Sequence, residues 1–245
     1  MMKKTLSIIV PVYNEEHTIA CVLDALVLLD IPDWQCEIII ADDGSTDGTH
    51  EIVASWARNA EARGRQNIRV VRRARNCGKG SAVRLGVSHA AGEAVLIQDA
   101  DREYDPADIP RLLDALDEGV DAVFGSRNLV PTGRGYWRYV AGARLLTWLA
   151  NWRYGSSLTD LYTGYKLVRM GIFRSCRLRA DGFAFEAEIA AELLARDACI
   201  REVPVSYHPR TFEEGKKIRA WDACIGVWTL LRRRTGADVL LQKRA

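Results

Sequence analysis

The chain has 245 residues, of which 48% are hydrophobic and 27% charged, which is the composition of an ordinary folded globular protein. The net charge of +2 does not indicate nucleic acid, and no nucleic-acid partner is expected. Because there is no run of about 18 uncharged apolar residues and the six cysteines lack C-x-x-C spacing, we expect no membrane span, no zinc site and no disulfide framework, and place the protein in the cytoplasm.

The first half of the chain alternates apolar, β-branched segments with helical patterns. Near-continuous apolar strands separated by helices are typical of a largely parallel sheet covered by helices on its faces. The sequence therefore predicts an α/β fold. The expected strands are 6–12, 37–41, 68–72, 94–98 and 121–125, and the expected helices are 15–29, 47–59, 78–91 and 107–117.

The second half is less regular. A long helical pattern covers 136–154, and after a loop a helix at 184–196 leads into a strand at 199–207. A last helix, 217–234, has its apolar residues on one side and polar residues on the other. We expect a catalytic domain over 1–216 and an amphipathic, basic C-terminal helix and tail over 217–245.

Tryptophans gather in the two late helices, which hold five of the seven, and Arg232-Arg233-Arg234 ends the last one. Aromatic, basic and amphipathic character together indicate a helix lying in a membrane interface. The alternative is that these tryptophans pack into the core. On the first interpretation the protein contacts the inner face of the membrane peripherally, and whether a membrane-anchored partner assists it stays open.

Acidic residues follow the strand at 94–98. Asp99, Asp101 and Glu103 are two positions apart, so in extended chain their side chains project to the same side. Mg²⁺ and Mn²⁺ are usually held by one or two carboxylates together with water and substrate phosphates. The position at the carboxyl end of a strand, where open α/β sheets bind ligands, favours a metal site for a diphosphate over a solvated turn.

Two other strand ends carry polar residues. The first strand runs into Asn14 and Glu15, which also suit a helix N-terminus, and the second ends in Asp42-Asp43 before a Gly-Ser-Thr turn. The adjacent aspartates suit the ribose and base of a nucleotide. The segment 76–81, N-C-G-K-G-S, lacks the spacing of a Walker phosphate loop, and we expect Gly78 and its neighbours to let a helix N-terminus approach the donor closely.

Six ordered motifs resemble glycosyltransferase family 2: VPVYNEE, ADDGSTDGT, NCGKGSA, DADREYDP, GSR and DLYTGYK. The likeness covers about residues 5 to 217. It implies the GT-A fold, a nucleotide-diphosphate sugar donor such as GDP-mannose or UDP-glucose, a divalent cation, and inversion at the anomeric carbon. Within the family the chain is most similar to the dolichyl- and polyprenyl-phosphate mannosyl- and glucosyltransferases, on the stretches 125–127, 160–166, 207–210 and 216–217.

The resemblance also implies roles for individual residues. The donor nucleotide would be contacted by Pro11, Tyr13, Glu15, Asp43 and Asp99, and from the helix start at 78–79 we also expect Gly78 and Lys79 to bind the donor. The metal would be held by Asp99, Asp101 and Glu103, although relatives commonly have glutamine at the last position. The donor diphosphate and acceptor phosphate would be faced by Arg127, Arg144, Arg210, Lys216 and Lys217.

The acceptor decides whether a general base is needed. A lipid phosphate arrives already anionic and requires cations, whereas a sugar hydroxyl must lose a proton to a carboxylate within reach. Asp160 is the candidate base of the second half, and it equally suits orienting Lys166 or capping a loop. We therefore expect transfer of mannose or glucose to a polyprenyl phosphate. The alternatives are transfer to a sugar hydroxyl in polysaccharide or lipopolysaccharide assembly, and a sugar-nucleotide-binding subunit without turnover.

Overall fold

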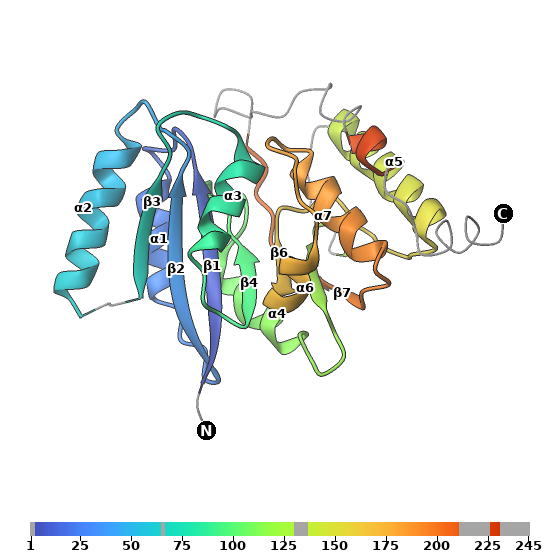
Figure 1. Cartoon of the computed structure of the whole chain (residues 1–245), viewed down its shortest axis with the longest axis horizontal. Helices are drawn as coiled ribbons and strands as arrows, with labels where there is room; N and C mark the ends of the chain where they lie inside the picture. Colours follow the sequence, from blue (N-terminus) through green and yellow to red (C-terminus); the bar gives the residue numbers. More distant parts are fainter. Residues whose placement is uncertain (1–2, 65–66, 130–136, 211–225, 231–245) are drawn as a thin grey trace.

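A seven-stranded sheet crosses the molecule in the order β3-β2-β1-β4-β6-β5-β7 (Figure 1). The computed structural model describes residues 3–64, 67–129, 137–210 and 226–230, without the side chains of 137–140. The strands are β1 (Lys4–Val12), β2 (Trp34–Asp42), β3 (Ile68–Arg72), β4 (Ala94–Ile97), β5 (Ala122–Ser126), β6 (Lys166–Arg169) and β7 (Ile200–Pro204).

The sheet is mostly parallel. Strands β3, β2, β1 and β4 pair in parallel, and so do β5 and β7, while β6 runs antiparallel between β4 and β5. The connecting helices are α1 (Ile19–Val27), α2 (Thr49–Ala62), α3 (Lys79–Ser88), η1 (Pro106–Asp108), α4 (Ile109–Asp114), α5 (Trp137–Tyr154), α6 (Met170–Ser175) and α7 (Phe185–Leu194).

Helices cover both faces of the sheet because its strands are apolar on both sides. In β1, Ile8 packs with α1, α2 and α4 in one hydrophobic cluster, and its neighbour Ile9 packs with α3, α5, α6 and α7 in the other. Successive side chains of a strand point to opposite faces, so an unbroken apolar strand requires a core on each side. The result is three layers, with loops at the carboxyl edge of the parallel strands left to form a site.

The predicted strands and most predicted helices are present, and the differences have local reasons. Strand β6 and helix α6 lie where a loop was expected, because four and six residues are too few to carry a periodic signal. The helix expected from residue 15 begins at Ile19, since Asn14 has a φ of 52° and residues after it form a turn. The expected helix 107–117 is the 3₁₀ turn η1 followed by the short α4.

The C-terminal predictions lie largely outside the described residues. Of the expected helix 217–234 the structure describes 226–230, which is helical, and the proposed domain boundary at 216 falls in a segment it does not describe. Within the described ranges, no helix combines the length and apolar character needed to cross a bilayer.

Candidate active site

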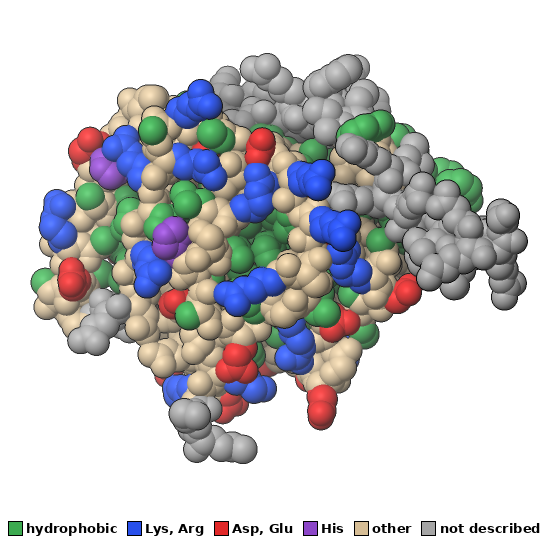
Figure 2. Space-filling view, in the orientation of Figure 1, with side chains coloured by type: hydrophobic (Ala, Val, Ile, Leu, Met, Phe, Trp, Pro, Cys, Tyr) green, Lys and Arg blue, Asp and Glu red, His purple; other side chains and the backbone are tan. Residues whose placement is uncertain are grey.

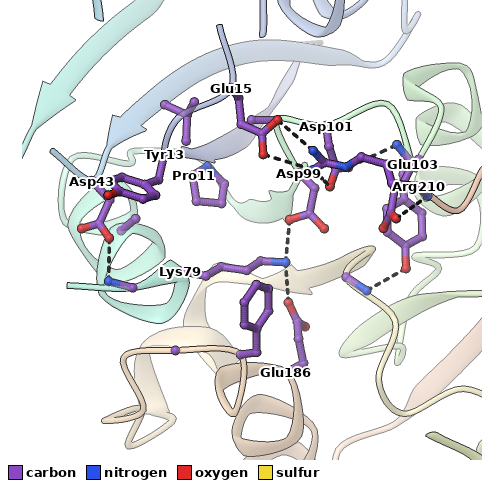
Figure 3. Close-up of a pocket in the computed structure, with 18 of the residues that line it drawn as sticks. Pro11, Tyr13, Glu15, Asp43, Lys79, Asp99, Asp101, Glu103, Glu186 and Arg210 are labelled. Carbon is purple, nitrogen blue, oxygen red and sulfur yellow. Dashed lines mark hydrogen bonds and ion pairs between the residues drawn. The ribbon is translucent and has the colours of Figure 1, made fainter. Parts of the chain in front are cut away.

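A pocket of about 370 Å³ opens at the carboxyl edge of the parallel strands (Figure 3). Its walls come from the loops after β1, β2, β4 and β5, the start of α3 and α7, and the segment after β7. Of the residues predicted to form the site, eleven line it: Pro11, Tyr13, Glu15, Asp43, Gly78, Lys79, Asp99, Asp101, Glu103, Arg127 and Arg210. Side chains up to about 200 positions apart in the sequence thus meet around one cavity.

Asp43 lies at one end of the pocket, directly after β2. Its Oδ2 accepts hydrogen bonds from the backbone N–H groups of Cys77 at 3.0 Å and Gly78 at 2.5 Å, where α3 begins. Gly78 has a φ of 97°, and an added Cβ would collide with the backbone of Asp181, so only glycine fits there. Burial raises the pKa of Asp43, partly offset by these two hydrogen bonds.

A chain of four alternating charges forms the floor of the pocket. Lys79 Nζ lies 2.5 Å from Asp99 Oδ1 and 2.7 Å from Glu186 Oε1, as the dashed lines of Figure 3 show. The other oxygen of Glu186 pairs with Lys166 Nζ at 2.7 Å. Lys166 and Glu186 are buried, so each charge is compensated by its neighbours in a place that excludes water.

The pKa shifts of these four paired side chains follow from burial and from the order of their charges. Burial raises the pKa of Asp99, with Lys79 opposing the shift, and burial lowers the pKa of Lys166, with Glu186 opposing it. For Glu186 burial alone would raise the pKa, but the two lysines together lower it. A carboxylate held between two ammonium groups is a strong hydrogen-bond acceptor and a weak base.

The close approach of these groups depends on Gly164, just before β6. A Cβ at this position would lie 2.5 Å from Asp99 Oδ2 and 3.4 Å from Lys79 Nζ. Its backbone N–H donates to the hydroxyl of Tyr104, which is itself buried. The absence of a side chain therefore allows the loop before β6 to close one side of the pocket.

Arg210 joins the loops after β1, β4 and β7. Its guanidinium pairs with both oxygens of Glu15, at 3.0 and 3.1 Å, and with Asp101 Oδ2. Its backbone N–H donates to Glu103 Oε1 at 2.9 Å, and the hydroxyl of Tyr207 donates to Glu103 Oε2 at 3.1 Å. Glu103 thus anchors the segment 207–210 beside the two aspartates.

The metal site expected from Asp99, Asp101 and Glu103 stays a prediction. In the described part of the chain, no three carboxylate, histidine or cysteine side chains are grouped to ligate a metal. Both oxygens of Glu103 accept hydrogen bonds, from Tyr207 and from the backbone N–H of Arg210, while Asp99 pairs with Lys79 and Asp101 with Arg210. Asp99 and Asp101 do line one pocket, and two carboxylates with the oxygens of a bound diphosphate are a suitable donor set for Mg²⁺ or Mn²⁺.

Arg127 lines the pocket and is fixed from behind by Asp160. The Nε and Nη2 groups of Arg127 donate to the two Asp160 oxygens at 2.7 and 2.8 Å, and its backbone N–H donates to Oδ2 at 3.0 Å. The guanidinium also lies over the ring of Tyr207, 5.0 Å from its centroid. Asp160 is only 1% exposed and does not line the pocket, and Lys166 pairs with Glu186 instead of Asp160.

Three other predicted residues are absent from this arrangement. Lys216 and Lys217 lie outside the described residues. Arg144 was expected to face phosphate, but it lies exposed on α5 and does not line the pocket, because Leu146 and Ala150 occupy the side of α5 that faces the core.

The sequence interpretation missed Glu186, Lys166 as its partner, and the aromatic residues Tyr104 and Tyr207. Glu186 opens α7, whose sequence F-E-A-E-I-A-A-E-L-L resembles an ordinary amphipathic helix. The signal in the sequence was that the neighbouring residues are mainly alanine, isoleucine and leucine, which are typical of buried positions. In the structure all three glutamates of this helix are buried. A carboxylate among alanines and isoleucine needs a partner, and here that partner comes from β6 and α3.

The family model for "Glycosyl transferase family 2" matches residues 7–177, and the chain belongs to this family. "Glycosyltransferase AglJ" of Haloferax volcanii is 34% identical over 83% of this chain and 63% of its own length. "Polyprenol monophosphomannose synthase" of Mycolicibacterium smegmatis is 29% identical over 83% of this chain and 77% of its own. The chain thus spans less than two thirds of the first of these relatives.

Among solved structures, glucosyl-3-phosphoglycerate synthase of Mycobacterium tuberculosis, in complex with Mn²⁺, uridine diphosphate and glucosyl-3-phosphoglycerate, superimposes with a TM-score of 0.70. The two chains are 24% identical, and the match covers 93% of this chain and 79% of the other. The fold is the GT-A fold that the resemblance implied.

Proposed function

We propose that the protein transfers one hexose, mannose or glucose, from a nucleotide-diphosphate sugar to a polyprenyl phosphate at the cytoplasmic face of a membrane, with inversion at the anomeric carbon. The donor would be GDP-mannose or UDP-glucose. Relatives named for polyprenol monophosphomannose synthesis and undecaprenyl-phosphate transfer support a lipid phosphate as acceptor. A neighbouring fold crystallised with Mn²⁺ and UDP-glucose supports a nucleotide sugar and a divalent cation.

One observation carries the choice of acceptor. Every carboxylate among the described residues of the pocket already accepts hydrogen bonds or pairs with a cation. These pairings are Glu15 and Asp101 with Arg210, Asp43 with Gly78, Asp99 and Glu186 with Lys79, and Glu103 with Tyr207. A hydroxyl acceptor needs a base, whereas an anionic phosphate needs cations, and Lys79, Arg127 and Arg210 line the pocket.

The donor end of the pocket suits a nucleotide. Among the described atoms, Asp43 Oδ1 is buried with no hydrogen-bond donor, beside Tyr13 and Pro11 at the wall. A buried acceptor of this kind is stabilised by an N–H group of a base or a hydroxyl of a ribose. The sugar and diphosphate would then extend along the floor toward Asp99 and Asp101.

In the proposed reaction a phosphate oxygen of the acceptor bonds to the anomeric carbon while the bond from that carbon to the diphosphate breaks, and the nucleoside diphosphate leaves. Asp99 and Asp101 would hold a divalent cation, which when bound neutralises charge on the leaving diphosphate. Arg127 and Arg210 would bind the phosphate oxygens. Because Asp160 already holds Nε and Nη2 of Arg127, its remaining N–H groups are oriented without further loss of freedom.

The test combines donor binding with turnover. GDP, UDP and their sugars are screened with Mn²⁺ by thermal shift, because a ligand that binds only the folded state raises the melting temperature. The best donor is then incubated with a short isoprenyl phosphate, and release of the nucleoside diphosphate and formation of the glycosyl phosphate are measured. Donor binding without release in the presence of any phosphate or sugar acceptor would indicate a non-catalytic subunit.

A companion variant separates the two acceptor classes. Asp160→Ala should leave glycosylation of a phosphate measurable, because its carboxylate positions Arg127 and takes no proton. Complete loss of activity, together with transfer to a sugar hydroxyl by the wild-type protein, would instead identify Asp160 as a base and overturn the phosphate acceptor.

A further inference from the structure

The solvent-facing side of α5 is apolar and aromatic. Leu146 and Ala150 turn toward the core and are buried, while Leu145, Trp148 and Trp152 are 60%, 62% and 68% exposed. At 100° per residue the last three fall within about one third of the helix circumference, opposite the buried pair. Figure 2 shows hydrophobic side chains at the outer edge of the molecule beside α5.

A third exposed tryptophan lies on the neighbouring helical turn. Residues 226–230 pack beside α5, where the hydroxyl of Tyr154 donates to the carbonyl of Leu230 at 2.8 Å (Figure 1). Leu230 is buried in this contact, and Trp228 is 58% exposed. We call Leu145, Trp148, Trp152 and Trp228 the tryptophan face.

The sequence of α5 and its flanks carries charge of one sign. The sequence from 122 to 159 contains no aspartate or glutamate in 38 residues, and its basic residues are five arginines, of which Arg144 and Arg153 lie on the described part of α5. Arg144 is exposed on the same side of the helix as Trp148. Elsewhere the chain mixes both signs, so this helix is unusual for the molecule.

The elements that carry the tryptophan face contact the wall of the pocket directly. Tyr162 lines the pocket, and Gly226 packs against it so closely that an added Cβ would collide with the Tyr162 hydroxyl. On α5 the hydroxyl of Thr147 accepts the backbone N–H of Leu161 at 3.2 Å. Both elements that carry the face therefore contact the segment 161–162, of which Tyr162 lines the pocket.

We propose that the tryptophan face docks onto a lipid bilayer with anionic headgroups and brings the pocket to the membrane surface, an inference that rests on the proposed function for the lipid-linked acceptor. Tryptophan rings suit the boundary between headgroups and acyl chains, and arginines beside them bind lipid phosphates. A second copy is a poorer occupant, because an isologous contact would bring arginines together with no carboxylate on either helix.

The test is binding to vesicles without donor or acceptor. The wild-type chain, the double variant Trp148→Ser/Trp152→Ser and the control Leu28→Ser are sedimented with phosphatidylcholine vesicles, with and without phosphatidylglycerol. Leu28 is 78% exposed and follows α1, on a part of the chain separate from α5. Each lost tryptophan should weaken partitioning roughly ten-fold, the size expected when one large apolar side chain is no longer buried.

The expected result is that the wild-type chain and Leu28→Ser bind, that the double variant binds roughly a hundred-fold more weakly, and that omitting phosphatidylglycerol weakens binding. Thermal shift with donor should be unchanged in the double variant, which shows that it is folded. Equal vesicle binding by the double variant, or a lipid-independent dimer abolished by it in light scattering, would overturn the proposal.

Failure of the proposed function gives a different pattern. If the protein binds vesicles through these tryptophans but transfers no sugar, the docking surface is supported and the proposed reaction is wrong. If the protein glycosylates a short soluble isoprenyl phosphate but does not bind vesicles, the proposed reaction is supported and the docking surface is wrong.

Discussion

The two halves of the sheet hold their charged side chains in different ways. On the side of β3, β2, β1 and β4, Asp43 comes directly after β2, and Asp99 and Asp101 lie in the loop that follows β4, so the strand ends place them. On the side of β6, β5 and β7, the cations Arg127 and Arg210 are oriented by carboxylates far away in the sequence, Asp160 and Glu15. Strand ends therefore place the carboxylates of the proposed donor side, and long-range ion pairs orient the cations of the proposed acceptor side.

The largest effect is expected at Asp101. Asp101→Asn should lower turnover by about 10³-fold with the fold intact, because it removes a proposed metal ligand and the partner of Arg210. Turnover is measured as nucleoside diphosphate release across a range of Mg²⁺ concentrations, with Asp114→Asn, on the exposed side of α4, as the matched control. Near-normal activity in excess Mg²⁺ would remove the metal role from the donor side.

Glu186→Gln tests the buried charge chain that joins the two halves. Removing this carboxylate leaves Lys79 and Lys166 without their shared partner, at a cost of about 3 kcal/mol in the free energy of unfolding. Urea denaturation measures the loss, and Glu93→Gln, at an exposed position, should change little. A loss below 1 kcal/mol would mean that the buried charge chain is not needed to hold the two halves of the sheet together.

The same variant has a predicted pH dependence. The folded pKa of Glu186 is lowered, so its stabilising contribution is fully present above the ordinary glutamate value of ~4.3 and is lost as the pH falls toward the folded value. The difference in melting temperature between the wild-type protein and Glu186→Gln should therefore be constant near neutral pH and shrink below about pH 4. A difference that grows on acidification would contradict the lowered pKa.

Arg127→Lys sharpens the acceptor side. Lysine keeps the charge but cannot make the two-point contact with Asp160, so turnover should fall about 30-fold while the fold is retained. Arg111→Lys makes the same change at an ion pair with Asp108 outside the pocket and serves as the control.

If Asp160 acts through Arg127, the effects of Asp160→Asn and Arg127→Lys should not add in the double variant. The shape of the rate against pH should also be unchanged in Asp160→Asn. Fully additive effects, or loss of an acidic limb of the profile, would give Asp160 a separate role in proton transfer.

The smallest effect is expected at Asp43. Asp43→Asn should weaken donor binding about ten-fold, the loss of one hydrogen bond to a charged group, with turnover at saturating donor little changed. Titration calorimetry with the donor measures the affinity. A large fall in turnover with unchanged affinity would move Asp43 out of the proposed nucleotide site.

The sequence by itself determined the layered α/β fold and the family, because apolar strands, helical periods and strand-end motifs are local patterns. It also predicted that most of the pocket residues lie close together, since residues after neighbouring parallel strands meet at one sheet edge. The antiparallel strand β6 was not predicted from the sequence, because four residues are too few to show a pattern and their direction is set by β4 and β5.

Only the tertiary structure decided which charges pair. Asp160 pairs with Arg127 and Lys166 with Glu186, although Asp160 and Lys166 belong to one motif, and Glu103 accepts hydrogen bonds from Tyr207 and Arg210. It also decided that Trp148 and Trp152 face outward and Leu146 inward. Pairing and exposure depend on what packs opposite each side chain, and that neighbour lies elsewhere in the chain.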